Sequence, residues 1–210
     1  MQERKLMELA EAAGTIAIVG HVRPDGDCVG SCLAVCNYIT EQYPEKTVDV
    51  YLETPPAKFS YLKQFERICS DPETGKQYDL CICLDSGDRE RLGKNVVYLD
   101  TAKASICIDH HITNQGYAGA NFVKADASAT CELLYEFLDE AKISKDVAEC
   151  IYTGILHDTN VFKNSNTTER TMQVAGAMMA KGINFSRIID ESFYKKTYVQ
   201  NQIMGRAVLE

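Results

Sequence analysis

Thr15-Ile-Ala-Ile-Val19 is a short run rich in β-branched residues, and a helical pattern from about Cys28 to Tyr43 follows it. Similar short runs recur along the chain and alternate with helical patterns. They are Thr47–Tyr51, Leu80–Leu84, Ser105–Ile108 and Ala120–Val123. Short apolar runs that alternate with helices are typical of buried parallel strands. The sequence therefore predicts an α/β fold with a mainly parallel, five-stranded sheet flanked by helices.

The chain after Thr130 shows helical patterns only, so a helical C-terminal part should follow the sheet. The expected helices run from about Thr130 to Ala141, Lys145 to His157, Thr168 to Lys181 (closed by Gly182) and Phe185 to Phe193. Another helical stretch is expected between Pro55-Pro56 and Phe65. Lys195-Lys196 is interpreted as part of a solvated helix face.

Length and composition are those of an ordinary globular protein. The chain has 210 residues, of which 45% are hydrophobic and 25% charged, enough for one sizeable core. No apolar run reaches the roughly 18 residues of a membrane span, and the stretch from Met1 to Ala10 carries too many charges for a signal peptide. Nine cysteines without a Cys-x2-Cys pair fit a reducing compartment, so we expect a cytoplasmic protein. Cys28, Cys32 and Cys36 share a helical face, which favours core packing over a metal cluster.

The net charge of −8 limits the binding partners. An anionic surface repels phosphates unless bound divalent cations reverse the local sign. The chain also has no block of Lys and Arg of the kind that binds duplex nucleic acid. Any nucleotide substrate is therefore expected to be small.

Imidazoles and carboxylates gather in two short segments, His21-Val-Arg-Pro-Asp25-Gly-Asp27 and Asp109-His110-His111. This mixture of ligands suits divalent metal ions. His21, Asp85 and Asp109 each follow a predicted strand, and the carboxyl ends of parallel strands form one ligand crevice. We therefore expect one site at that edge of the sheet, although Asp85 read alone could cap the next helix and Asp158 could cap a helix end.

With these motifs, the chain resembles the DHH phosphoesterases, which take their name from the tripeptide at 109–111. The resemblance covers about residues 15–182 and also includes Leu84-Asp85-Ser-Gly and Gly154-Ile-Leu-His-Asp158-Thr. The run Asp158-Thr-Asn-Val-Phe162, followed by Asn166-Thr-Thr168, is most similar to the bacterial nano-RNase and pAp-phosphatase branch. RecJ-type exonucleases and family II pyrophosphatases are more distant.

The resemblance implies two divalent cations, usually Mn²⁺, with Mg²⁺ and other divalent ions as alternatives. It assigns His21 and Asp25 to the first ion, Asp27, His110 and Asp158 to the second, and Asp85 to a bridge between them. His111 would face the phosphate and act in catalysis with Asp85. Asp109 would orient a metal-binding side chain without binding the ion itself. Arg91 is a candidate phosphate contact, and an exposed loop arginine without a substrate role is the alternative.

The implied reaction is hydrolysis of short oligoribonucleotides, of 3′,5′-phosphoadenosine, or of both, by a hydroxide that the two ions generate. Alternatives are a cyclic or linear dinucleotide phosphodiesterase, an inorganic pyrophosphatase and a catalytically silent nucleotide-binding module. We predict a catalytic domain over residues 1–182 and a helical extension over 183–210 that leads towards a second domain absent from this chain. Val199, Ile203, Met204, Ala207 and Val208 form an apolar helical stripe that expects a partner surface. Two arrangements would cover this stripe: a homodimer through this region, or packing of the stripe against the rest of the same chain.

Overall fold

The computed structural model describes residues 5–209. Residues 1–4, where the predicted catalytic domain and the charged N-terminal stretch begin, lie outside the described residues, as does Glu210.

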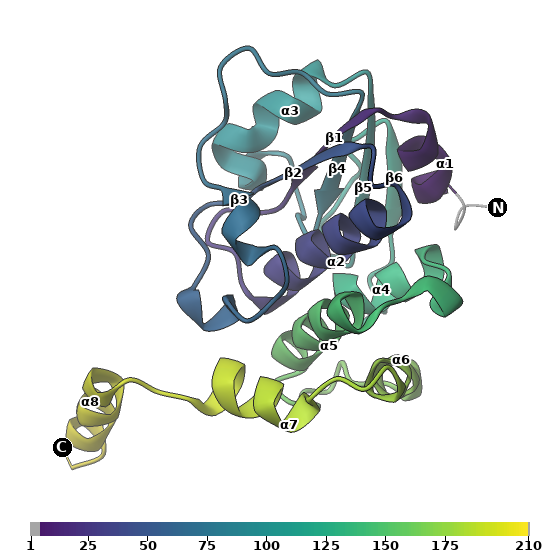
Figure 1. Ribbon diagram of the computed structural model, residues 1–210. Helices are drawn as coiled ribbons and strands as arrows, with labels where there is room; N and C mark the ends of the chain where they lie inside the picture. Colours follow the sequence, from purple (N-terminus) through teal and green to yellow (C-terminus); the bar gives the residue numbers. More distant parts are fainter. Residues whose placement is uncertain (1–4, 210) are drawn as a thin grey trace.

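Within the described residues, six strands form one all-parallel sheet in the order β3-β2-β1-β4-β5-β6 (Figure 1). All five predicted strands are present: β1 (Thr15–Val19), β2 (Thr47–Tyr51), β4 (Leu80–Leu84), β5 (Ala104–Asp109) and β6 (Ala120–Val123). The prediction of a parallel α/β sheet is thus confirmed. The additional strand β3 (Ile68–Cys69) pairs with β2 at the edge of the sheet. It was not predicted, because two residues are too few to show a periodic pattern.

The central strands are covered on both faces, which explains why they lack a polar alternation. Every residue of β4 is buried. Leu80, Ile82 and Leu84 point into the larger of two core clusters, and Cys81 and Cys83 point into the smaller one. Burying one such Leu or Ile side chain stabilises the fold by about 1.5–3 kcal/mol.

Helices occupy both faces of the sheet (Figure 1). On one side α2 (Gly26–Gln42) lies against the strands, α5 (Lys145–Asp158) packs along α2, and α6 (Glu169–Ala180) packs along α5. Two more helices of this side are α1 (Lys5–Ala12) and α4 (Thr130–Phe137), and the opposite face carries α3 (Val96–Thr101). The sequence patterns predicted α2, α4, α5 and α6 but not α1 or α3, which are short.

Two expected helices differ from the structure. The helix from Thr130 ends at Phe137 instead of Ala141, because Leu138 adopts extended backbone angles, and a separate 3₁₀ turn follows at Glu140–Lys142. The helix expected before Phe65 is wrong, since only the 3₁₀ turns η1 (Ala57–Phe59) and η2 (Phe65–Arg67) form there. A fourth 3₁₀ segment is η3 (Glu90–Asn95).

The C-terminal part begins with α7 (Phe185–Ile188), which continues into the π-helical turn η5 (Ile189–Tyr194). Residues 195–197 then form a non-helical connector to α8 (Tyr198–Leu209). The interpretation of Lys195-Lys196 as a helix face is therefore wrong: Lys195 has φ −61° and ψ 122°, in the extended region. The predicted apolar stripe is helical, but no residue of α8 is buried. The ribbon of α8 stands at the end of the connector, away from the sheet (Figure 1). No helix within residues 5–209 has both the length and the apolar character needed to cross a membrane.

Candidate metal centre

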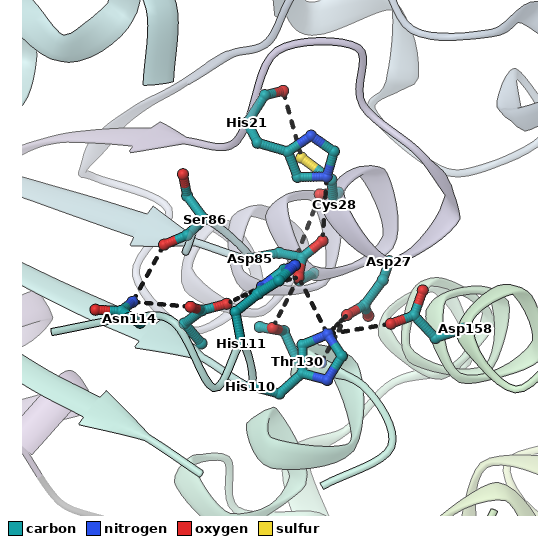
Figure 2. Close-up of polar contacts among 12 residues, drawn as sticks. His21, Asp27, Cys28, Asp85, Ser86, His110, His111, Asn114, Thr130 and Asp158 are labelled. Carbon is teal, nitrogen blue, oxygen red and sulfur yellow. Dashed lines mark hydrogen bonds and ion pairs between the residues drawn. The ribbon is translucent and has the colours of Figure 1, made fainter. Parts of the chain in front are cut away.

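Three neighbouring strands deliver polar side chains to one edge of the sheet. His21 follows β1, Asp85 follows β4, and His110 and His111 follow β5. Because these strands are parallel and adjacent, their carboxyl ends meet at the same edge, as the sequence predicted. Figure 2 shows the side chains converging at the N-terminal end of α2.

The loop after β1 places two further carboxylates. Asp25 is the N-cap of α2, and its Oδ1 accepts hydrogen bonds from the backbone N–H groups of Asp27 and Cys28, each at 3.1 Å. This cap fixes the direction in which the first turn of α2 leaves the strand. Asp25 is 58% exposed, whereas Asp27 in the first turn of α2 is fully buried.

The buried carboxylate of Asp27 is held by the start of α4. It accepts hydrogen bonds from the backbone N–H of Thr130 at 2.6 Å and of Cys131 at 2.9 Å. The Thr130 hydroxyl donates to Asp85 Oδ1 at 3.1 Å. Gly154 of α5 leaves room for this arrangement, since a Cβ atom there would lie 2.5 Å from Asp27 Oδ1.

The histidines face the carboxylates through one ring nitrogen each. His21 Nε2 lies 3.4 Å from Asp85 Oδ2 and 3.7 Å from Asp25 Oδ1. His110 Nε2 lies 3.1 Å from Asp158 Oδ2 and 3.6 Å from Asp85 Oδ1. Asp85 thus presents one oxygen to each histidine, and the structure brings all six residues predicted as metal ligands together.

The other nitrogen of each ring is engaged elsewhere. His21 Nδ1 lies 2.8 Å from the Val22 carbonyl oxygen, and His110 Nδ1 lies 3.3 Å from the Ala127 carbonyl oxygen. Since a carbonyl only accepts, Nδ1 carries the proton in both rings. A neutral ring then directs its Nε2 lone pair at the carboxylate cluster, which is the tautomer that a metal ligand needs.

Histidine protonation reflects the surrounding negative charge. Burial by itself lowers the pKa of His21, but the carboxylates of Asp25 and Asp85 outweigh burial and raise that pKa. For His110, burial is likewise outweighed, chiefly by Asp158, and the pKa is raised to about 10. Protons therefore partly compensate the carboxylates when no cation does so.

The carboxylates respond to burial and to one another. Burial raises the pKa of Asp27 well above its ordinary range, and the nearby charges of Asp85 and Asp158 raise it further. Burial also raises the pKa of Asp158. At Asp25 the effect of burial is outweighed by His21 and by backbone N–H donors, which lower its pKa to about 2. The interior of the cluster therefore holds more negative charge than it can stabilise alone.

The donor set fits divalent cations. Among the described residues, three groups each hold potential ligand atoms within 4.8 Å of one another: His21 with Cys28 and Asp85, Asp85 with His110 and His111, and Asp27 with His110 and Asp158. Four carboxylates bring a formal charge of −4, which two divalent ions would offset. Oxygen-rich sites with some imidazole suit Mn²⁺ or Mg²⁺ better than structural Zn²⁺.

His111 occupies a different position from His110. Its Nδ1 lies 2.7 Å from Asp109 Oδ1, and the Asn114 side chain donates to the other oxygen of Asp109 at 2.8 Å. Asp109 therefore orients His111 rather than His110. Arg91 Nη1 lies 3.4 Å from His111 Nε2, which places this predicted phosphate contact beside the cluster.

Sequence patterns missed several residues that complete the site. Thr130 and Cys131 contribute through backbone N–H groups, which carry no residue-specific signal. Asn114 lies in a loop without a motif. Cys28 is in the core, as expected, but its sulfur also belongs to one of the ligand groups. The strand-end position of His21 was the one signal that could have drawn attention to this cysteine.

The sequence comparison identifies the class of protein. The DHH family, N-terminal domain, matches residues 15–155, which is more than half of the chain. The chain belongs to the DHH family, as its resemblance to these phosphoesterases predicted.

Curated relatives are similar over most of this chain. It is 32% identical over 190 residues to the bifunctional oligoribonuclease and PAP phosphatase NrnA of Bacillus subtilis (strain 168), a match that covers 88% of this chain and 59% of that protein. It is 28% identical over 209 residues to the protein of the same name from Thermus thermophilus, with 98% of this chain and 62% of that protein covered. The chain spans about three fifths of the length of these relatives.

A solved structure shares the fold. An exopolyphosphatase-related protein from Bacteroides fragilis superimposes with a TM-score of 0.90 at 24% sequence identity, over 100% of this chain and 65% of that one. This similarity supports the α/β architecture together with its C-terminal helices.

Proposed function

We propose that the chain is a metal-dependent phosphoesterase that hydrolyses short oligoribonucleotides and 3′,5′-phosphoadenosine. The observation that carries the proposal is the position of Asp85, whose two oxygens face His21 and His110 at 3.4 and 3.6 Å. Such a carboxylate can bridge two cations. Membership of the DHH family and the similarity to the NrnA proteins support the same activity.

In this proposal six side chains hold two divalent cations, with Mn²⁺ as the preferred ion. His21 and Asp25 would hold the first, Asp27, His110 and Asp158 would hold the second, and Asp85 would be shared by both. When bound, such a pair activates water for attack on phosphorus and neutralises charge that develops on the phosphate. Thr130 and Cys131 keep Asp27 and Asp85 in the orientation that this arrangement requires.

His111 and Arg91 bind the phosphate in the proposed mechanism. The hydrogen bond to Asp109 places the His111 proton on Nδ1 and raises the pKa of the ring. A second proton on Nε2 then allows His111 to donate to a phosphate oxygen or to the leaving oxygen. The Arg91 guanidinium, which only donates, faces Nε2 in this structure, so it would turn to the phosphate as a second donor once Nε2 is protonated.

The chain has two parts in this proposal. Residues 1–182 form the catalytic domain, and residues 183–210 form a helical extension towards a second domain. The exposed apolar side chains of α8, among them Val199 at 63% and Ile203 at 62%, fit a helix that packs against another surface, either in that domain or in a homodimer. The nine cysteines, all free, fit the reducing cytoplasm.

A side-by-side assay tests the substrate. The chain is incubated with Mn²⁺ and a dinucleotide RNA, 3′,5′-phosphoadenosine, a cyclic dinucleotide or pyrophosphate, and each reaction is repeated in EDTA. Metal-dependent release of mononucleotide or phosphate from the first two is expected. Preference for the cyclic dinucleotide or for pyrophosphate would replace the proposed substrate. Nucleotide binding that persists in EDTA without hydrolysis would indicate a silent binding module.

A further inference from the structure

A groove of 710 Å³ lies between η1 and the segment that joins η5 to α8. Its charged and aromatic lining consists of Lys58, Tyr61, Arg187, Glu191, Lys195 and Lys196. Lys58, Lys195 and Lys196 also line an adjoining pocket of 370 Å³, which extends towards Ile203 and Met204 of α8. The three lysines are therefore shared by one continuous surface.

The groove is positively charged in a chain whose net charge is −8. Arg187 and Glu191 form an ion pair at 3.1 Å and offset each other. Lys58, Lys195 and Lys196 form no ion pair with any residue between 5 and 209. Three uncompensated ammonium groups at one place attract a chain of phosphates.

Two exposed tyrosines flank the lysine pair in the sequence, although they are not among the residues that line the groove. Tyr194 and Tyr198, on either side of the Lys195-Lys196 connector, are 48% and 75% exposed. The connector is not helical, and both of its lysines line the groove. Basic residues interleaved with exposed aromatic rings are typical of surfaces that bind single-stranded nucleic acid, where phosphates meet cations and bases stack on rings.

The groove adjoins the candidate metal centre through His157, the one histidine that the sequence analysis left without a role. The His157 ring packs on Phe59 of η1, with centroids 5.0 Å apart, and Nε2 is hydrogen-bonded to the Ser192 hydroxyl of η5 at 3.1 Å. On its other side the ring fills the space beside Gly26, where a Cβ atom would lie 2.3 Å from the His157 Cγ. Both walls of the groove thus contact His157, and the His157 ring packs against the loop that carries Asp25 and Asp27.

Lys58 is the lysine nearest to this junction. Its ammonium lies 4.9 Å from the centroid of the Phe59 ring. Lys58 thus adjoins the aromatic ring on which His157, the residue beside the loop of the metal centre, packs.

We propose that the groove of Lys58, Lys195 and Lys196 binds the backbone of a single-stranded RNA whose terminal phosphodiester lies at the metal centre. The inference rests on the proposed function and extends it to substrates longer than two nucleotides. The lysines pair with successive phosphates, and Tyr194 and Tyr198 stack on bases. Inorganic polyphosphate offers the same phosphate chemistry but has no bases to stack.

The first experiment removes the positive charges of the two lysines in the connector. Binding of a hydrolysis-resistant, phosphorothioate-linked five-nucleotide RNA to the full chain with Mn²⁺ is measured by fluorescence anisotropy across a salt series. The K195A/K196A variant should bind about tenfold more weakly, and its salt dependence should be shallower by about 1.4 in log–log slope, since each single-strand phosphate contact contributes about 0.7. K142A/K145A is the matched control, because it removes two exposed lysines that also lack an ion pair within residues 5–209. Equal effects of the two double variants would overturn the proposal.

The second experiment separates RNA from polyphosphate. Y198A should weaken RNA binding about tenfold, Y198F should restore it, and neither should change the binding of inorganic polyphosphate. A loss that is the same for both ligands, or polyphosphate binding tighter than that of RNA, would refute an RNA groove.

Wild-type hydrolysis of bis(p-nitrophenyl) phosphate, a diester with no further phosphates for the groove lysines to bind, distinguishes the two proposals. If this diester and RNA both stay intact while K195A/K196A still loses RNA binding, the groove stands and the phosphoesterase proposal fails. If the diester is cleaved but K195A/K196A binds RNA as the control does, the groove proposal fails alone.

Discussion

The carboxylate of Asp27 accepts a hydrogen bond from the backbone N–H of Thr130 at 2.6 Å, although 103 residues separate the two in the sequence. The contact fixes a carboxylate on the first turn of α2 to the first residue of α4. Helix N-termini carry a partial positive charge, so α4 stabilises this buried anion as well as orienting it. Thr130 also donates its hydroxyl to Asp85, and one residue thereby restrains two carboxylates of the candidate metal centre.

Thr130→Val tests this restraint. Valine keeps the shape and the backbone N–H but removes the hydroxyl that binds Asp85. We expect Mn²⁺ affinity to fall about tenfold, as for other groups that orient metal ligands, and the free energy of unfolding to fall by about 1 kcal/mol. Calorimetric Mn²⁺ titration and urea unfolding measure the two effects. Thr130→Ser retains the hydroxyl and should resemble the wild type, and a Thr130→Val protein with unchanged affinity would contradict the prediction.

Asp85→Asn tests the bridge. The amide keeps the size of the side chain but removes the charge and turns one oxygen into a donor, so a second cation loses its shared ligand. Bound Mn²⁺ should drop from two ions to one, and hydrolysis should fall at least about 100-fold. Asp88→Asn is the control, because Asp88 belongs to the same loop but is exposed and caps Arg91 N–H. Two ions still bound to Asp85→Asn would refute the bridge.

The sequence predicted which residues would meet at this edge of the sheet, because strand ends and the His/Asp motifs are both local. β1, β4 and β5 are read from short apolar runs, and His21, Asp85 and His110 come directly after them. Once the sheet is parallel, geometry brings these residues together. Asp158 was harder, since nothing in its own helix distinguishes a ligand from a helix cap, and the family resemblance supplied the assignment.

The parts of the fold and of the site that the sequence did not predict depend on contacts that local patterns do not encode. The start of α4 reaches Asp27 only after the whole domain has folded, and backbone N–H groups are the same in every residue. η5 adopts a π-helical turn whose end leaves Lys195 extended, so the lysine pair that a helical pattern placed on a helix face lies in a connector. β3 is held in place by pairing with β2 rather than by its own two residues.

Asp109→Asn tests the orientation of His111. Asparagine retains a hydrogen-bond acceptor for Nδ1–H but lacks the negative charge that stabilises a doubly protonated ring. We expect kcat to fall about 100-fold with Mn²⁺ binding unchanged, which steady-state kinetics and a metal titration can establish together. Asn114→Ala, which removes only the donor to the other oxygen of Asp109, should give a smaller loss. A decrease in Mn²⁺ affinity equal to the decrease in kcat would show that Asp109 acts on the metal ligands instead.

His157 makes the stability of the metal-free protein depend on pH. Burial, with a further contribution from Lys58, lowers its folded-state pKa to about 4, below the ordinary value of about 6.5. The unfolded chain therefore binds the proton first, and this contribution to stability is lost as the pH falls from about 6.5 towards 4. Between about pH 7 and pH 5 it amounts to about 1–2 kcal/mol.

Urea unfolding in EDTA at these two pH values, for wild type and for His157→Gln, measures that contribution. Glutamine can keep a hydrogen bond to Ser192 but does not titrate, and the titrations of His21 and His110 are common to both proteins. The wild type should lose about 1–2 kcal/mol more than the variant on acidification. If both proteins lose the same free energy, His157 is not a buried neutral side chain, and its place between the metal loop and the walls of the groove would have to be revised.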